Sequence, residues 1–423
     1  MQTSLPAALL HTRSGKEADE ILRNCVHCGF CNATCPTYQL TGDELDGPRG
    51  RIYLIKQVLE GHKPTAKTRL HLDRCLTCRA CETTCPSGVD YHHLLDTGRA
   101  LVAQDTRRPL HERIMRFALR QLLSSSRRFT PLLRSGQLLR PLLPAALQAR
   151  IPARQRVPRK PALRQHARTM LLLDGCVQPA LAPQINHATT GVLDMLGIEA
   201  IVAAGSGCCG ALSHHLDAEH EARLFMRRNI DAWWPHMENG AEAIVITASG
   251  CAPMVKEYGR LLADDAGYRE KAARVSEIAR DISEVVAAET SGNPVEKKDN
   301  GIRVAFHSPC TLQHGQQITG VVEDILVHAG YTLLPVADSH LCCGSAGTYS
   351  ILQAGLATQL RDNKLAALQA GKPDVIATAN IGCHTHLAGF AGVPVVHWIE
   401  LLARPATKDI HAQSAITDTA REP

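Results

Sequence analysis

Aromatic side chains and long apolar runs are both scarce in this chain of 423 residues. Only 3 Trp, 7 Tyr and 6 Phe occur, which favours an Ala- and Leu-rich helical protein organised by ligands over a β-sandwich. No apolar run approaches the roughly 18 residues that a membrane-spanning helix requires, and the first residues lack the basic and apolar regions of a secretory signal. We therefore expect a cytoplasmic protein, or one that is peripheral on the cytoplasmic face of the inner membrane.

Cysteine, in contrast, is abundant, with 16 residues. Residues 25–36 follow the pattern C-x2-C-x2-C-x3-C-P, which returns fifty positions later in residues 75–86. This spacing is typical of bacterial two-cluster ferredoxins, in which the fourth Cys ligates the other cluster. We therefore predict two [4Fe–4S] clusters with exchanged fourth ligands. The first set is Cys25, Cys28, Cys31 and Cys85, and the second is Cys35, Cys75, Cys78 and Cys81.

Zinc and disulfides are the alternatives for these eight Cys. Structural zinc explains two C-x2-C pairs, but neither the third Cys nor the C-P ending that both copies share. A reducing compartment disfavours disulfides. Iron–sulfur clusters are the favoured interpretation.

Residues 1–103 are expected to form a small helical domain around these clusters. Apolar spacing predicts helices over residues 17–24, from Pro48 to just before Gly61, over 66–74 and over 90–103. Because ligand binding and folding are coupled in such sites, we expect this domain to be unfolded or molten without iron.

Residues 104–168 form a connector of different composition. From Arg107 to Arg168 there are sixteen Lys or Arg and one acid, Glu112, although the net charge of the chain is only +5. Prolines cut the segment into short helices and an extended linker. The favoured interpretation is that its Leu side chains pack on a neighbouring domain while its Arg side chains are solvated. The alternative is a basic amphipathic surface for anionic lipid or an acidic partner, and nucleic acid is not expected as a partner.

Beyond the connector, alternating strands and helices occur twice. Buried strands are predicted at residues 170–174, 200–203 and 243–247, and again at 303–306, 332–335 and 375–378. Helices are predicted between them near 184–196, 217–238, 316–329 and 350–369. This alternation predicts two α/β modules, residues 169–288 and 302–403, each with a parallel sheet. Glu289–Gly301 is the predicted linker and 404–423 a polar tail, so the fold class is a multidomain α+β protein.

Each module carries four further Cys, and every one of them follows a predicted strand. They are Cys176, Cys208, Cys209 and Cys251 in the first module, and Cys310, Cys342, Cys343 and Cys383 in the second. The first three are repeated at an offset of 134 and the last at 132. Because the carboxyl ends of parallel strands share one edge, these thiols should converge there. We predict a metal or redox role, with a further cluster and a redox thiol site both left open.

Two other features near these loops are given weaker interpretations. Gly205 to Gly210 has the spacing G-x-G-x-x-G, but the second copy, His340 to Gly344, lacks the first two glycines, which disfavours a dinucleotide site. Histidines beside the loops could act as ligands or support them, yet a surface or packing role is favoured for each; they are His214, His215, His384 and His386.

Two ferredoxin-type motifs followed by two Cys-Cys-Gly modules resemble the iron–sulfur subunits of bacterial glycolate oxidase. The segment Gly47-Pro48-Arg49-Gly50-Arg51-Ile52 and the spacing C-x31-C-C in both modules support the resemblance. It implies an electron-transfer subunit that works with an FAD-containing oxidase subunit and its flavoprotein-like relative. Those partners oxidise glycolate to glyoxylate, and this chain passes electrons toward a quinone or other acceptor. FAD is then expected only in the partner, and this chain alone should not act on glycolate.

Related subunits leave two alternatives. Those of anaerobic glycerol-3-phosphate dehydrogenase and of lactate-oxidising complexes share the module order, so the donor could be L-lactate or sn-glycerol-3-phosphate. The modules also resemble the cysteine-rich subunit of heterodisulfide reductases, so a thiol/disulfide reductase is the second alternative. In that family the last element is C-x2-C, whereas this chain has single Cys at Cys251 and Cys383, which puts a heterodisulfide-type cluster in doubt.

Overall fold

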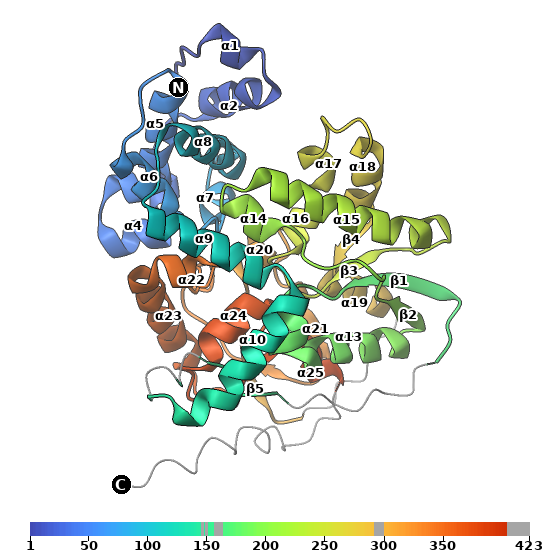
Figure 1. The fold of residues 1–423 in the computed structure, drawn as a ribbon. Helices are drawn as coiled ribbons and strands as arrows, with labels where there is room; N and C mark the ends of the chain where they lie inside the picture. The colour runs from blue at the N-terminus through green and yellow to red at the C-terminus, as the bar shows by residue number, and fades with distance from the viewer. Residues whose placement is uncertain (145–147, 149–150, 156–163, 292–299, 404–423) are drawn as a thin grey trace.

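The structure is a computed structural model that describes residues 1–144, 148, 151–155, 164–291 and 300–403. A helical N-terminal region leads through two connecting helices into two α/β modules (Figure 1). The predicted polar tail, Pro158 and Pro161 of the connector, and most of the predicted linker lie outside the described residues.

The N-terminal region is entirely helical in the part described. The predicted helices correspond to α2, α5, α6 and α8, and α5 begins at Pro48 because the first helical turn does not use a backbone N–H. The elements are α1 (Ala7–Leu10), α2 (Arg13–Asn24), α3 (Phe30–Ala33), α4 (Pro36–Thr41), the 3-10 turn η1 (Glu44–Asp46), α5 (Pro48–Leu59), α6 (Ala66–Asp73), α7 (Ala80–Thr83) and α8 (Tyr91–Asp105).

The core of this region combines apolar side chains with thiols. Leu22 of α2, Ile55 of α5 and Leu94 of α8 are fully buried together, and Cys25 and Cys81 belong to the same cluster. A small helical domain has little apolar core of its own. A ligand bound by these thiols would therefore add to the stability of the domain.

The first module contains a four-stranded sheet in which every strand pair is parallel, in the order β2-β1-β3-β4. The strands are β1 (Arg168–Leu173), β2 (Ile198–Ile201), β3 (Ile244–Ile246) and β4 (Ala279–Asp281). The helices are α12 (Gln178–Leu181), α13 (Pro183–Met195), α14 (Ala211–His215), α15 (Glu219–Glu238), α16 (Ala252–Lys256), α17 (Tyr258–Leu261), α18 (Arg269–Ile278) and α19 (Ile282–Thr290).

The second module repeats this topology, with the order β6-β5-β7-β8 and parallel pairing throughout. The strands are β5 (Arg303–His307), β6 (Thr332–Leu333), β7 (Val375–Thr378) and β8 (Val395–His397). The helices are α20 (Cys310–Gln313), α21 (Val321–His328), α22 (Tyr349–Leu352), α23 (Ala354–Gln369), α24 (Ile381–Ala388) and α25 (Trp398–Ala403). The predicted α+β class with two repeated parallel sheets is confirmed.

The sequence analysis missed the last strand of each sheet. β4 and β8 have only three residues, and each continues directly into a helix, α19 or α25. So short a segment leaves no alternating pattern to recognise. Each forms because the neighbouring strand, β3 or β7, offers an open edge to pair with.

The two modules share one core. Met170 and Leu172 of β1 belong to the same buried cluster as Val304 and Phe306 of β5. Backbone and side-chain hydrogen bonds also cross between them, such as that from Ser249 N to Ala379 O at 3.0 Å. The modules therefore form a single body, and the sheets cannot reorient without exposing this core.

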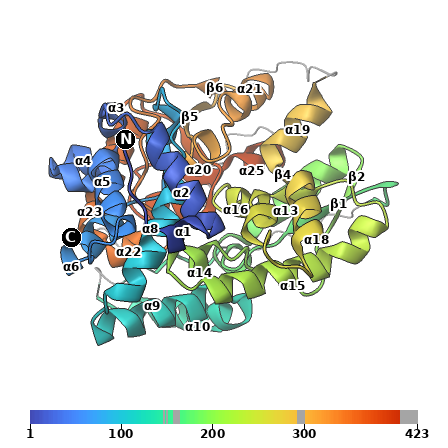
Figure 2. The ribbon, with the colours of Figure 1, turned by 90° about the horizontal axis from the view of Figure 1, so that it is seen from above.

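The connector begins with α9 (Leu110–Leu123), α10 (Ser126–Leu139) and the 3-10 turn η2 (Arg140–Leu142), which lie on the outside of the molecule (Figure 2). The favoured interpretation of this segment is wrong for part of α9. Leu119, Leu122 and Leu123 are half-buried, but Arg116 pairs inward with Asp73 of α6 at 3.2 Å, whereas Ile114 and Phe117 are 59% and 55% exposed. Asp73 attracts this arginine, and two large apolar side chains of α9 lie on the outside.

None of the helices in the described part of the chain has both the length and the apolar composition needed to cross a bilayer.

Candidate functional site

Both cysteine loops of the N-terminal region have an unusual backbone. His27 and Gly29 have φ of 60° and 89°, and Thr77 and Arg79, fifty positions later, have φ of 53° and 62°. A left-handed conformation costs a non-glycine residue roughly 1–2 kcal/mol. Three of these four residues are not glycine, so each loop is held in a shape that wraps its thiols around one space.

The first loop and one distant Cys line a cavity near the surface. Its walls include Cys25, Cys28 and Cys31 of the first motif and Cys85 of the second. Cys28 is exposed. The structure thus brings together the four residues of the first predicted set.

A second cavity lies beside the first and is lined by Cys75, Cys78, Cys81 and, from the first motif, Cys35. Pro48, Tyr91 and Cys81 line both cavities. The two cavities are therefore neighbours with a shared wall.

Polar groups surround the second cavity more closely. Arg51 Nη1 lies 4.0 Å from Cys35 Sγ, and Thr37 Oγ1 lies 3.2 Å from the same sulfur. The Tyr91 hydroxyl donates to Cys75 Sγ at 3.7 Å. Hydrogen bonds to cluster sulfur ligands are one means by which proteins set reduction potentials.

Arg51 is part of a buried charge network. Its side chain is 1% exposed, and its Nη2 lies 3.8 Å from Asp46 Oδ1. Asp46 also pairs with Arg74 at 2.7 Å and with His71 Nδ1 at 2.8 Å. One buried carboxylate thus neutralises part of two guanidinium charges, which leaves a positive surplus beside the second cavity.

The protonation of these thiols shows what they can hold. Burial raises the pKa of Cys31 to about 11 and raises the pKa of Cys78 and Cys81 well above the ordinary value. Crowded, buried thiols therefore stay protonated unless a cation compensates for their charge. The four Cys side chains that line each cavity fit an iron–sulfur cluster, which is held by four Cys thiolates.

The Cys of the first module converge at the carboxyl edge of its sheet, as predicted. Their thiols interact in a chain in the order Cys176, Cys208, Cys209, Cys251. Tyr258 supports the loop by donating to Cys209 O at 2.7 Å.

The second module brings its four Cys together in the same way. Cys310 Sγ lies 3.8 Å from Cys342 Sγ, and Cys343 continues the chain to Cys383. The glycine that follows the Cys pair is required, because Gly344 has φ of 85° and a Cβ there would lie 2.7 Å from Ala357 O.

Two thiols of the second module lie close to residues that line the second cavity of the N-terminal region. Cys310 and Cys342 contact the same apolar cluster as Leu76 and Cys78. Within the described residues, the apolar clusters that contain first-module Cys include no residue of the N-terminal region. The two modules are therefore not equivalent in their relation to that region.

Ion pairs bind the N-terminal region to the first module. Glu257 accepts from His92 at 3.0 Å and contacts His93 at 3.4 Å, and Asp96 pairs with His214 at 3.0 Å. Burial opposes protonation of His92, but its carboxylate partners prevail and raise its pKa to about 11. The imidazolium is thus charged at neutral pH and helps to fix the position of the second cavity.

The structure gives no support to a nucleotide site at Gly205 to Gly210. The amide of Gly207 donates to Asn229 Oδ1 at 2.9 Å, and that of Gly210 contacts Cys208 Sγ at 3.5 Å. Amides already engaged in this way are not available to a pyrophosphate.

Comparison with known protein families accounts for both halves of the chain. The 4Fe-4S dicluster domain family matches residues 21–89. The cysteine-rich domain family matches twice, at residues 170–256 and 304–388. The chain is therefore an iron–sulfur protein.

Curated relatives match over nearly the whole length. The glycolate oxidase iron-sulfur subunit of Escherichia coli (strain K12) is 55% identical over 97% of this chain and 100% of its own length. The chain belongs to the family of glycolate oxidase iron–sulfur subunits. Another relative, the probable glycolate oxidase iron-sulfur subunit of Bacillus subtilis (strain 168), is 30% identical over 91% of this chain and 94% of its own length.

More distant relatives of this family member share less of the chain. Lactate utilization protein A of Bacillus licheniformis is 27% identical over 54% of this chain and 95% of its own length. A crystal structure of a hypothetical protein from Helicobacter pylori matches with a TM-score of 0.53 at 10% identity, over 94% of this chain and 74% of that one. This last similarity concerns the fold alone.

The histidines beside the thiol loops mostly have packing or pairing roles, as favoured from the sequence. His214 joins Asp96 and Glu219, and His386 lies 3.3 Å from Ala357 O. His307, which lies among the thiols of the second module, was not predicted as a site residue from the sequence. The available signal was a polar residue at the end of an apolar strand, where the first copy has Leu173.

Proposed function

We propose that this chain is the electron-transfer subunit of a glycolate oxidase complex, a glycolate dehydrogenase that uses an acceptor other than oxygen. A partner flavoprotein, with FAD and a flavoprotein-like relative, removes two electrons from glycolate to give glyoxylate. This chain passes the electrons one at a time toward a quinone or other acceptor. The observation that carries the proposal is the pair of adjoining thiol-lined cavities, with a third group of thiols beside the second.

Each cavity is proposed to hold one [4Fe–4S] cluster with an exchanged fourth ligand. Such clusters supply one-electron chemistry when bound. The residues around them position the sulfur ligands, exclude water and supply positive charge. Tyr91 and Arg51 do this at the second cavity through the contacts to Cys75 and Cys35.

Substitution of the two fourth ligands tests the exchange. Cys85→Ser is expected to alter the electron paramagnetic resonance signal of the cluster bound by Cys25, Cys28 and Cys31. Cys35→Ser should alter the other signal. If each substitution instead affects the cluster of its own motif, the exchange is wrong.

The Cys of the modules are proposed to serve as further redox groups, either as one more cluster or as thiols. Cys310 and Cys342 are the candidates next in line after the second cavity, since they share a cluster of side chains with Cys78. Ala substitution of Cys342 should slow electron exit from the reduced N-terminal clusters. The matched Cys208→Ala in the first module should have less effect.

The division of labour has a direct test. Glycolate-dependent dye reduction should require the flavoprotein partner, and a complex reconstituted with this chain should transfer electrons to a quinone analogue. Activity of this chain alone with glycolate would contradict the proposal. L-lactate and sn-glycerol-3-phosphate belong in the same assay, since lactate utilization proteins are among the relatives.

A thiol/disulfide reductase is the second candidate, because Cys310 and Cys342 lie 3.8 Å apart at the sulfur atoms. It predicts reduction of a disulfide substrate by the reduced chain, and loss of that activity in Cys342→Ala. Absence of disulfide reduction in the wild-type chain would exclude it.

The outward face of α9 and α10 favours peripheral contact with the cytoplasmic face of a membrane. Leu110, Ile114 and Phe117 are exposed there, and Arg113 and Arg127 are exposed close by in the sequence. Apolar side chains flanked by cations suit an anionic lipid surface.

Sedimentation with phosphatidylglycerol vesicles tests this contact. Binding should exceed that to phosphatidylcholine and should weaken in Phe117→Asp. Met195→Asp, which changes an exposed apolar residue at the end of α13, is the matched control. Equal binding by both variants would contradict the proposal, and a partner subunit would then be the occupant to examine.

A further inference from the structure

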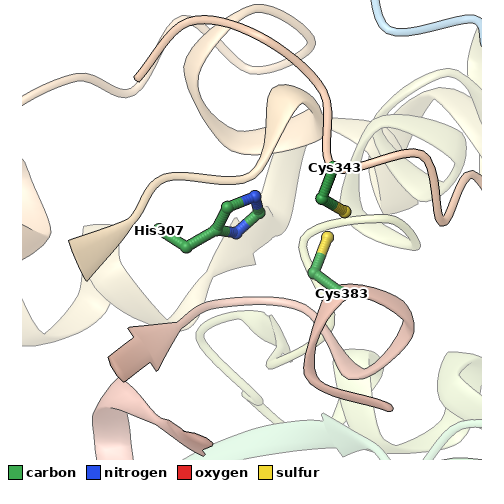
Figure 3. A group of neighbouring side chains, drawn as sticks. All are labelled: His307, Cys343 and Cys383. Atoms are coloured by element: carbon green, nitrogen blue, oxygen red, sulfur yellow. The ribbon is translucent and has the colours of Figure 1, made fainter. Parts of the chain in front are cut away.

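One group of donor atoms in the second module combines a histidine with two of its cysteines. His307 ends β5, Cys343 lies in the loop after β6, and Cys383 lies in α24 after β7. The imidazole points toward the two sulfur atoms (Figure 3). One donor atom from each of the three lies within 4.8 Å of the other two, and all three residues are buried.

The imidazole nitrogen that faces this group has no hydrogen-bond partner. His307 is 2% exposed, and its Nε2 is buried and unsatisfied, whereas its Nδ1 lies 3.0 Å from Thr378 Oγ1. Leaving such a group unpaired costs roughly 1–3 kcal/mol. Donation from Nδ1–H to Thr378 leaves the lone pair on Nε2, the arrangement in which a second group orients a metal-binding histidine.

The three side chains together have the chemistry of a metal site. A neutral imidazole nitrogen and two thiolates form a donor set typical of zinc.

Comparison of the two modules shows that this group is specific to the second. At the matching position, 134 residues earlier, the first module has the buried Leu173. The same offset relates Lys364, which is 4% exposed, to the fully buried Ile230. The charge of Lys364 acts on Cys343, Cys342 and Cys310. A buried cation there helps to compensate for thiolates, whereas the cation that acts on Cys208 of the first module is the exposed Arg228.

The position of the donors separates them from the other two thiols of the module. Cys343 and Cys383 belong to the module's own apolar core, while Cys310 and Cys342 face the N-terminal region. The thiols of this module thus divide into two groups.

We propose that His307, Cys343 and Cys383 bind a single zinc-class divalent ion that holds the three strand ends of the second module together. This site uses none of the eight N-terminal Cys, and it leaves Cys310 and Cys342 to the proposed electron exit.

Zinc and iron content of the full-length, iron-loaded chain tests the proposal. Wild-type protein should retain one equivalent of zinc against a chelator, and X-ray absorption at the zinc edge should show both nitrogen and sulfur ligands. His307→Leu, which introduces the residue of the first module, should weaken zinc binding at least about 100-fold, and Thr378→Val about 10-fold. His328→Gln, a substitution of an exposed histidine at the end of α21, is the control and should leave zinc binding unchanged.

Equal zinc retention in wild type and His307→Leu would overturn the proposal, as would loss of iron in place of zinc. If His307→Leu fails to fold, His307→Cys serves instead. It should keep the ion while the nitrogen contribution disappears from the zinc-edge spectrum, and an unchanged spectrum would overturn the proposal. The resonance signals of the N-terminal clusters should persist in every variant, so failure here is distinct from failure of the electron-transfer proposal.

Discussion

The buried Arg51 should raise the reduction potential of the second cluster site selectively. Its guanidinium lies 4.0 Å from Cys35 Sγ and is almost fully buried, so solvent screens it weakly. The nearest matching residue at the first site, Arg49, is more exposed and pairs with Glu44 at 2.6 Å. The sites thus differ in how much unscreened positive charge they feel.

The size of the effect follows from Coulomb's law. Two unit charges 4 Å apart interact by about 4 kcal/mol at an effective dielectric constant of about 20. The added electron spreads over the whole cluster, and Asp46 lies 3.8 Å from Arg51 and opposes it. We therefore expect Arg51→Met to lose about 1–2 kcal/mol, which lowers the potential by about 40–90 mV for a one-electron couple.

Redox titration followed by electron paramagnetic resonance measures both potentials in one sample. Arg51→Met should lower the potential of the cluster whose signal Cys35→Ser perturbs and leave the other within error. Arg51→Lys keeps the charge and should stay close to wild type, and Arg49→Met should have a smaller effect on its own site. If Arg51→Met shifts both potentials equally, or if the Lys and Met variants behave alike, the electrostatic reasoning is refuted.

Three further predictions concern stability. Gly50→Ala should destabilise the N-terminal region by about 2 kcal/mol or more in urea unfolding, because its Cβ would lie 2.2 Å from Glu44 O. The control, Gly191→Ala in α13, meets nothing within 4 Å and should be neutral or slightly stabilising. Equal losses of stability in both variants would contradict the steric explanation. Removal of iron by a chelator should abolish the helical signal of residues 1–103 while the two sheets persist, and a fully helical iron-free region on hydrogen exchange would disprove this. The pair of His92 and Glu257 makes stability depend on pH. Because the pKa of His92 is raised to about 11, its contribution to stability is complete below the unfolded value of about 6.5 and is lost as the pH rises toward 11. Because the pKa of Glu257 is lowered, its contribution is complete above about 4.5 and is lost in acid. The melting temperature should therefore fall between pH 6.5 and 9 in wild type and fall less in Glu257→Gln, and parallel profiles would argue against this pair.

Much of the fold, and the cysteine pattern of the N-terminal site, could be predicted because the sequence signals for them are local. The spacing of Cys25, Cys28 and Cys31 depends only on the few residues between them, and the repeat at residues 75–86 marks a second site of the same kind. Strand and helix alternation is likewise visible in short windows, which is why six of the strands were found. The constant offset of 134 between the first three Cys of the two modules predicts that the modules have the same topology.

Contacts between distant segments could not be predicted in this way. The direction of α9 depends on Asp73, Asp217 and Glu221 lying opposite its arginines, and β4 and β8 exist because β3 and β7 leave an edge to pair with. These partners lie far from α9, β4 and β8 in the sequence, so a short segment of sequence does not reveal them.

The sequence by itself determined that this protein is built around repeated thiol donors, because covalent spacing decides which cysteines can reach a common centre. Only the tertiary structure decided that thiols of the second module, and not of the first, share an apolar cluster with residues that line the second N-terminal cavity, and that His307 meets Cys343 and Cys383. Both results come from packing between segments far apart in the chain, whose free energy depends on shape and burial and not on local pattern.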